Sequence, residues 1–175
     1  ALHTPRLNNL TNGQIVSGSS LNLSIPQMVN LGLMSVKEAL VLSGATLDNQ
    51  GTLQGSRVGL SFTGDVVNRG NARLVAQKDL TLSAASLNNQ GTLAGDSVNI
   101  ITNLLTNVGL LQGNSALALN SLTPSTLVLN NKTGGQIITG GALTLSLPQL
   151  TNQGLLLSQQ GLTLNLDNLD NQGIV

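Results

Sequence analysis

The stretch that decides the fold is Leu47-Asp48-Asn49-Gln50-Gly51-Thr52-Leu53, which returns as Leu87-Asn88-Asn89-Gln90-Gly91-Thr92-Leu93. In each copy an asparagine stands two positions before a glycine, ahead of a short aliphatic run. Asparagine and glycine both tolerate the backbone conformations that tight turns require. The motif therefore predicts a recurring turn. Further copies begin at Val29, Val67, Leu105, Leu150 and Leu169.

These copies recur at a nearly constant interval. Successive anchoring asparagines are 18, 19, 19, 21, 18, 24, 21 and 19 residues apart, a mean close to 20. A unit of this size cannot bury its own apolar face, so the period predicts a solenoid of stacked coils. We expect about nine coils in a single domain over residues 1–175. The anchoring residues are Asn12, Asn30, Asn49, Asn68, Asn89, Asn107, Asn131, Asn152 and Asn171.

Between the turns, leucine alternates with polar residues at a period of two. The segments 21–25, 80–82, 143–147 and 162–166 show this alternation, which sends leucine to one face of a strand and polar residues to the other. Strands of successive coils would pair in parallel about 4.8 Å apart, giving a rod on the order of 40 Å long. The predicted fold is all-β, a parallel β-helix.

The turn asparagines are expected to stack in register and to hydrogen-bond from coil to coil along the rod. This ladder is predicted to have a structural role. Its members are Asn30, Asn49, Asn68, Asn89, Asn107, Asn152 and Asn171.

Two segments depart from the period. Residues 1–6 precede the first repeat and are expected to form a cap or leader. Residues 121–126 lengthen one coil and contain Pro124, which has no N–H for a ladder, so an outward loop is predicted there.

Composition excludes several classes of function. Seven basic and seven acidic residues cancel, so no net charge favours a nucleic-acid partner. The chain has no cysteine, and therefore no disulfide framework or thiolate chemistry. His3 is the only histidine and has no partner for catalysis. No cofactor or metal is expected.

The motifs at 47–53 and 87–96 resemble the repeats of filamentous haemagglutinin-type exoproteins, which include two-partner secretion adhesins and contact-dependent growth inhibition effectors. The resemblance covers about residues 7–175. It implies a right-handed β-helix, export through an outer-membrane two-partner secretion transporter, and a secreted location at the surface of a Gram-negative bacterium. Neither the amino-terminal secretion motifs nor a carboxy-terminal toxin region of that family is present in this sequence.

The resemblance implies a structural, adhesive rod that projects a distal binding or toxin module toward target cells. An alternative is that the segment itself binds a receptor or a glycan. A third hypothesis, a polysaccharide-active β-helix enzyme, needs carboxylates gathered on one face. Asp48 and Asp170 fall in the same column of the repeat but about six coils apart, so no catalytic residues are predicted. The exposed strand edges of an isolated rod further predict end-to-end self-association.

Charged residues concentrate in the middle coils, where they fall at one turn of four successive units. This stripe is the predicted partner-binding surface, with a solvated edge as the alternative interpretation. It comprises Lys37, Glu38, Arg57, Lys78, Asp79 and Asp96, with Arg69 and Arg73 expected close by.

Three Asn-x-Ser/Thr sequons begin at Asn9, Asn22 and Asn131. Among them, Asn131 is expected to be the best glycosylation acceptor, since it lies on a loop-like unit.

Overall fold

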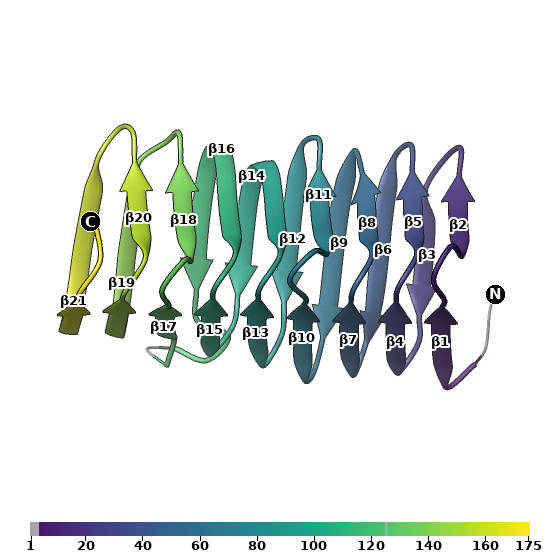
Figure 1. Cartoon of the computed structure of the whole chain (residues 1–175), viewed down its shortest axis with the longest axis horizontal. Helices are drawn as coiled ribbons and strands as arrows, with labels where there is room; N and C mark the ends of the chain where they lie inside the picture. The colour runs from purple at the N-terminus through teal and green to yellow at the C-terminus, as the bar shows by residue number, and fades with distance from the viewer. Residues whose placement is uncertain (1–3, 125) are drawn as a thin grey trace.

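The chain folds as an uninterrupted stack of coils. The computed structural model describes residues 4–124 and 126–175, and His3 and part of the predicted cap lie outside them. These residues form parallel strands and no helix, in about nine coils roughly 19 residues apart, which confirms the predicted all-β solenoid (Figure 1). The part of the chain that the structure describes accordingly contains no helix able to span a membrane.

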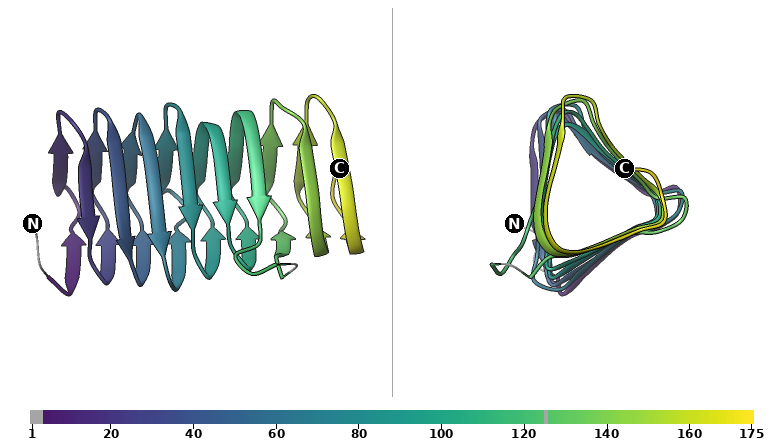
Figure 2. Two further views of the ribbon diagram at one scale, coloured as in Figure 1. Left: turned by 180° about the vertical axis from the view of Figure 1, so that it is seen from behind. Right: turned by 90° about the vertical axis from the view of Figure 1, so that its left-hand side faces the viewer.

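The coil is right-handed. In Figure 1 the chain rises on the near side and descends on the far side while it advances from right to left. The view from behind in Figure 2 places the long descending strands in front. This is the handedness that parallel strand connections overwhelmingly adopt.

Seen along its axis, the rod is a triangle with three sheet faces (Figure 2). Face A contains β1 (Arg6–Asn9), β4 (Gln27–Asn30), β7 (Thr46–Asn49), β10 (Asp65–Asn68), β13 (Ser86–Asn89), β15 (Leu104–Asn107), β17 (Val128–Asn131) and the second halves of β19 (Leu143–Asn152) and β21 (Leu162–Asn171). Face B contains β2 (Gln14–Ser17), β5 (Leu33–Val36), β8 (Thr52–Gly55), β11 (Arg73–Ala76), the first halves of β14 (Thr92–Ile101) and β16 (Leu110–Asn120), β18 (Gln136–Thr139) and β20 (Leu155–Ser158). Face C contains β3 (Leu21–Ser24), β6 (Ala39–Gly44), β9 (Arg57–Phe62), β12 (Asp79–Ser83), the second halves of β14 and β16, and the first halves of β19 and β21.

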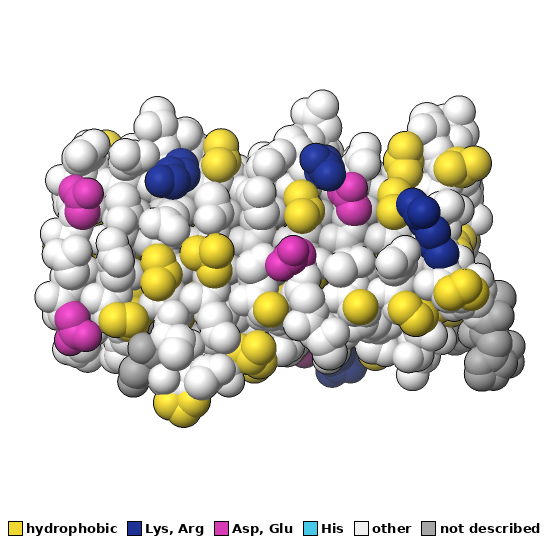
Figure 3. Space-filling view, turned by 90° about the horizontal axis from the view of Figure 1, so that it is seen from below, with side chains coloured by type: hydrophobic (Ala, Val, Ile, Leu, Met, Phe, Trp, Pro, Cys, Tyr) yellow, Lys and Arg dark blue, Asp and Glu magenta, His cyan; other side chains and the backbone are white. Residues whose placement is uncertain are grey.

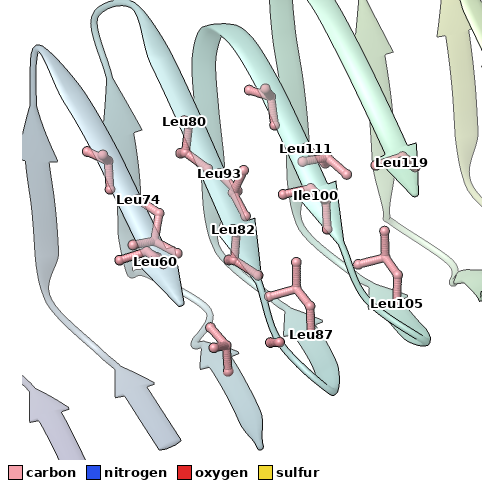
Figure 4. Packing of buried hydrophobic residues seen from close by; sticks show 14 of the residues in the cluster. Leu60, Leu74, Leu80, Leu82, Leu87, Leu93, Ile100, Leu105, Leu111 and Leu119 are labelled. Carbon is pink, nitrogen blue, oxygen red and sulfur yellow. The ribbon is translucent and has the colours of Figure 1, made fainter. Parts of the chain in front are cut away.

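One continuous core fills the triangle. Inward-facing aliphatic residues stack in columns, one residue per coil, because nearly all strands pair in register with their counterparts in the next coil. On face C, for example, Leu60, Leu82 and Ile100 are in register and almost completely buried (Figure 4). Such columns need side chains of similar size, which is why the chain manages with a single aromatic residue, Phe62.

The glycine of the repeated motif lies at the corner between faces A and B, packed against the coil before it. A Cβ on Gly51 would overlap the carbonyl oxygen of Gly32, and a Cβ on Gly109 would overlap that of Gly91. These glycines are therefore required by close backbone approach rather than by an unusual φ angle. In one coil a longer turn lets Ala72 occupy the equivalent place, where it is buried.

Residues 121–124 and 126–127, between β16 and β17, leave the rod at the corner between faces C and A (Figure 2). Asn103 holds them there: its Oδ1 accepts hydrogen bonds from the Thr123 backbone N–H (2.9 Å) and the Thr126 hydroxyl (2.8 Å). At the other irregular segment, Arg6 already begins β1 and the Pro5 carbonyl accepts from Gln27 N–H. The first coil thus starts inside the predicted cap.

Candidate functional site

Nine asparagines form an internal column where face A ends. Each of the first eight donates its Nδ2 to the Oδ1 of the asparagine in the next coil, at 2.7–2.9 Å. The same Nδ2 also reaches a backbone carbonyl, as from Asn89 to Leu110 at 3.0 Å. Every amide points the same way, so the column is a directional chain of hydrogen bonds in the interior. It runs through Asn9, Asn30, Asn49, Asn68, Asn89, Asn107, Asn131, Asn152 and Asn171.

The first member of this column is Asn9, and the assignment of Asn12 as the first anchor is wrong. Asn12 lies in an exposed turn with a φ of 67°. The signal that identifies Asn9 is Leu7-Asn8-Asn9, which matches Leu47-Asp48-Asn49, whereas the turn that follows is two residues longer than in most coils. The Asn-x-Gly spacing is therefore a less reliable marker of the asparagine column than the residues that precede the asparagine.

The column also corrects the expectation for glycosylation. Asn131 is fully buried and donates to Asn152 Oδ1 at 2.7 Å, so it is not an accessible acceptor. Asn9 is likewise buried. Of the three sequons, only Asn22, on the outer side of β3, has an exposed side chain.

The charged stripe lies at the corner between faces B and C. Backbone hydrogen bonds connect successive coils there: Arg57 N–H donates to Glu38 O (2.9 Å) and Ser97 N–H to Lys78 O (3.0 Å). Val58 pairs with Leu80, so the residues that precede them, Arg57 and Asp79, are also neighbours in successive coils. We call Lys37, Glu38, Arg57, Lys78, Asp79 and Asp96 the charged corner; they occupy four successive coils.

Within the charged corner the carboxylates all have partners. Asp79 pairs with Arg57 at 3.1 Å, and both side chains remain more than half exposed. Glu38 accepts from the Ser20 hydroxyl (3.1 Å), and Asp96 from the Ser115 hydroxyl (2.6 Å). In the described residues Lys37 and Lys78 form no ion pair. The corner therefore offers two ammonium groups for interaction, about two coils or 10 Å apart along the rod.

Arg69 and Arg73 do not join this corner. Arg69 lies at the corner between faces A and B, where its guanidinium donates two hydrogen bonds to Asp48, at 2.8 and 2.9 Å. That pairing lowers the pKa of the Asp48 carboxyl, mainly through the hydrogen bond, and raises the pKa of Arg69. Arg73 begins β11 on face B, five residues before Lys78. Which corner a residue occupies depends on how the turns and strands of its coil divide the three sides of the triangle. The spacing of residues in the sequence did not reveal this division.

The remaining carboxylates are dispersed. Strand register places Asp48 and Asp170 in one outward column of face A, six coils apart, which corresponds to about 29 Å. No group of three potential metal-ligating side chains occurs in the described part of the chain. In the space-filling view from below, most charged side chains stand apart, and one basic and one acidic group lie side by side near the middle of the rod (Figure 3).

A groove of about 380 Å³ lies on the outside of face A, near the amino-terminal end. Its charged lining residues are Arg6, Asp48 and Asp65. Arg6 donates to Asn8 Oδ1 (3.0 Å), Asp48 is held by Arg69, and Asp65 accepts from the Ser86 hydroxyl (2.7 Å). The charged groups of the groove are thus already hydrogen-bonded to other residues of the chain.

Two known proteins are similar to this chain over most of its length. Deoxyribonuclease CdiA of Dickeya dadantii (strain 3937) is 31% identical over 143 residues, which make up 81% of this chain and 4% of that protein. The 16S rRNA endonuclease CdiA of Enterobacter cloacae subsp. cloacae is 35% identical over 159 residues, 91% of this chain and 5% of that protein. No family model and no solved structure matches the chain. The homologues and the solenoid together confirm the predicted resemblance to filamentous haemagglutinin-type repeats.

Proposed function

We propose that this chain, homologous to segments of CdiA contact-dependent growth inhibition proteins, is a structural rod segment of a large secreted exoprotein. The observation that carries the proposal is the unbroken amide column, which links all nine coils through one core. Because each coil contacts mainly its neighbours, stability and length both increase coil by coil, which suits a spacer. The rod would hold a distal binding or toxin module away from the producing cell.

The proposed export route and cellular location follow from the similarity to filamentous haemagglutinin-type exoproteins. The exoprotein would leave the cell through an outer-membrane two-partner secretion transporter and be displayed on the surface of a Gram-negative bacterium. A solenoid with few long-range connections can form progressively as it emerges, with each completed coil offering strand edges to the next.

The segment itself would have no catalytic role. Its two relatives are named as nucleases, but the chain spans only about one twentieth of the length of each. The separation of Asp48 from Asp170 also argues against a paired-carboxylate site, since such groups must lie within about 10 Å of each other.

A segment exchange in the full exoprotein tests the spacer role. The nine coils would be deleted, or replaced by nine coils from elsewhere in the same rod, and inhibition of target cells would be measured. A spacer predicts that deletion impairs inhibition and that the replacement restores it. If the replacement is secreted and folded but inactive, the segment has a specific role and the spacer proposal fails.

The second candidate function is direct recognition of a receptor or glycan through the charged corner. It is favoured by Lys37 and Lys78, which are unpaired in the described chain although acidic groups lie in the same corner. Binding of the labelled chain to bacterial and epithelial cells would be compared with that of a Lys37→Gln/Lys78→Gln variant. Arg73→Gln, on face B, serves as the matched control. Saturable binding lost only in the double variant would support recognition, and absence of binding would reject it.

End-to-end self-association of the isolated chain also remains a proposal. It is supported by the direction of the amide column, which presents the Oδ1 of Asn9 toward one end and the Nδ2 of Asn171 toward the other. Association should therefore be head to tail. Sedimentation over a range of protein concentrations tests it, and a single monomeric species up to millimolar concentration would contradict it.

A further inference from the structure

The sheet on face C is interrupted once. From β3 to the second half of β16, each strand pairs with the next coil, and the first half of β19 pairs with β21. In the described residues, no strand pairing joins residues 116–120 of β16 to residues 143–147 of β19. We call this interruption the seam. It lies between the sixth and seventh coils, and Figure 2 shows it as a wider interval between the long strands in the view from behind.

Faces A and B continue across the seam. On face A, β15 pairs with β17 over four residues, and on face B, β16 pairs with β18 over four residues. The amide column also crosses it, from Asn107 to Asn131 at 2.9 Å. The two parts of the rod are therefore joined along two sides of the triangle and unpaired along the third.

The seam slightly opens the core. Leu117 and Leu119, the inward residues on its amino-terminal side, are 5% and 6% exposed. Their counterparts in the preceding coil, Val98 and Ile100, are 1% and 0% exposed. Inward leucines also lie on the carboxy-terminal side, as at Leu143 and Leu145. The strands on both sides of the seam thus show the inward–outward alternation of paired strands, yet no strand pairing joins them.

Chain length at the two adjoining corners explains the interruption. The coil from Asn107 to Asn131 is the longest, at 24 residues, because a long segment, residues 121–124 and 126–127, leaves the rod at one corner and is held against Asn103. At the other corner Gly140 and Gly141 pack against the carbonyl oxygens of Asn114 and Ser115. The strand at 143–147 therefore starts from a tight corner, whereas the strand at 116–120, on the other side of the seam, ends at the long segment.

We propose that the seam is a hinge at which the rod bends by opening and closing face C. Faces A and B act as the hinge line, since their continuous ladders resist separation of the coils. Elsewhere, bending would have to break backbone hydrogen bonds on a face, but at the seam there are none on face C to break. Such collective motions of rigid parts occur on the microsecond-to-millisecond timescale. The rod would then be two stiff parts of about six and three coils rather than one.

Pairs of spin labels on the outside of face C test the hinge, and the absence of native cysteine makes their attachment selective. The seam-crossing pair is Thr81→Cys/Thr163→Cys. The matched control is Asn22→Cys/Asn99→Cys, in the same outward column without crossing the seam. The control pair spans four paired intervals, about 19 Å of backbone separation, whereas the seam-crossing pair spans three paired intervals and the wider, unpaired seam.

Electron–electron double resonance on the frozen chain should give a distance distribution about twice as broad for the seam-crossing pair as for the control. Distributions of equal width would overturn the proposal. Circular dichroism of both labelled chains checks that they are folded.

Hydrogen exchange of the unmodified chain gives an independent measurement. Those amides of 116–120 and 143–147 that face the seam should exchange about tenfold or more faster than the amides of β9 and β12, although all lie in strands on the same face. Equal protection would mean that face C closes as a sheet in solution, and the hinge would be rejected.

Discussion

The corner between faces A and B and the corner between faces B and C recur equally often along the rod, yet they differ in what they permit. The first contains a buried asparagine and, in most coils, a glycine with backbone packed against it. In the first six coils the second carries lysine, arginine, glutamate, aspartate or serine, all near solvent. The comparison indicates that the corner between faces A and B holds the coils together. The corner between faces B and C can vary its side chains and is therefore free to acquire a binding function.

The largest effect on this contrast is expected from removing one asparagine side chain from the amide column. Asn89→Ala would leave Asn68 Nδ2 without its asparagine acceptor and Asn107 Oδ1 without its donor. Each buried polar group left unpaired costs roughly 1–3 kcal/mol, so we expect a loss of about 3 kcal/mol in unfolding free energy. Urea denaturation followed by far-ultraviolet circular dichroism measures it.

The matched control for that change is the neighbouring asparagine. Asn88 lies on the outer side of face A, and its Oδ1 is buried without a hydrogen-bond partner, so Asn88→Ala removes no hydrogen bond of that oxygen and should not destabilise the rod. Equal losses for the two variants would show that the amide column does not stabilise the rod.

A smaller loss is expected from filling the space at the glycine of the same corner. In Gly51→Ala the new methyl group would overlap the Gly32 carbonyl oxygen, so two coils must separate locally. We expect about 1–3 kcal/mol of destabilisation, as for other overpacked sites. Gly18→Ala, at the corner between faces B and C, has open space around the added carbon and should be nearly neutral. A neutral Gly51→Ala would contradict close packing of the coils.

The ion pair on the outside of face A should have a weaker effect, and one that depends on pH. Because the folded-state pKa of Asp48 lies below its ordinary value of 3.8, its contribution is fully present well above pH 3.8. It is lost as the pH falls through the lowered pKa. Melting temperatures of the wild type, Asp48→Asn, Arg69→Gln and the double variant should therefore differ at pH 6, and the differences should shrink as the pH falls below 3.8. A difference that persists unchanged at pH 2 would mean that the carboxylate charge is not responsible.

The smallest effect is expected at the charged corner. Lys37 and Lys78 form no ion pair in the described chain, so Lys37→Gln/Lys78→Gln should leave the urea midpoint unchanged within error. A clear loss of stability would show that this corner also holds coils together, and it would remove the contrast between the two corners. An unchanged midpoint makes the same variant a clean probe of cell binding.

Several elements could be predicted because they depend on local patterns. The alternation in 143–147 identified a strand and its inward face, and the repeat period gave the number of coils. The amides of Asn49 and Asn89 were expected to face their counterparts in neighbouring coils, and such hydrogen bonds are present in the structure. Asn9 was missed because a longer turn separates it from its glycine, and Arg69 was misplaced because sequence distance does not distinguish one corner from another.

The sequence by itself determined that this protein is a repeating stack of parallel strands with an aliphatic core and a turn asparagine in each unit. Those properties follow from residue alternation and turn chemistry, which act over a few neighbouring residues. Only the tertiary structure decided which residues share a corner, which side chains pair across coils, and that face C is interrupted between residues 120 and 143. These features depend on how each coil accommodates its extra residues around the triangle, since the longer turn after Asn68 keeps Arg73 in register with Thr52 whereas face C loses its pairing after residue 120.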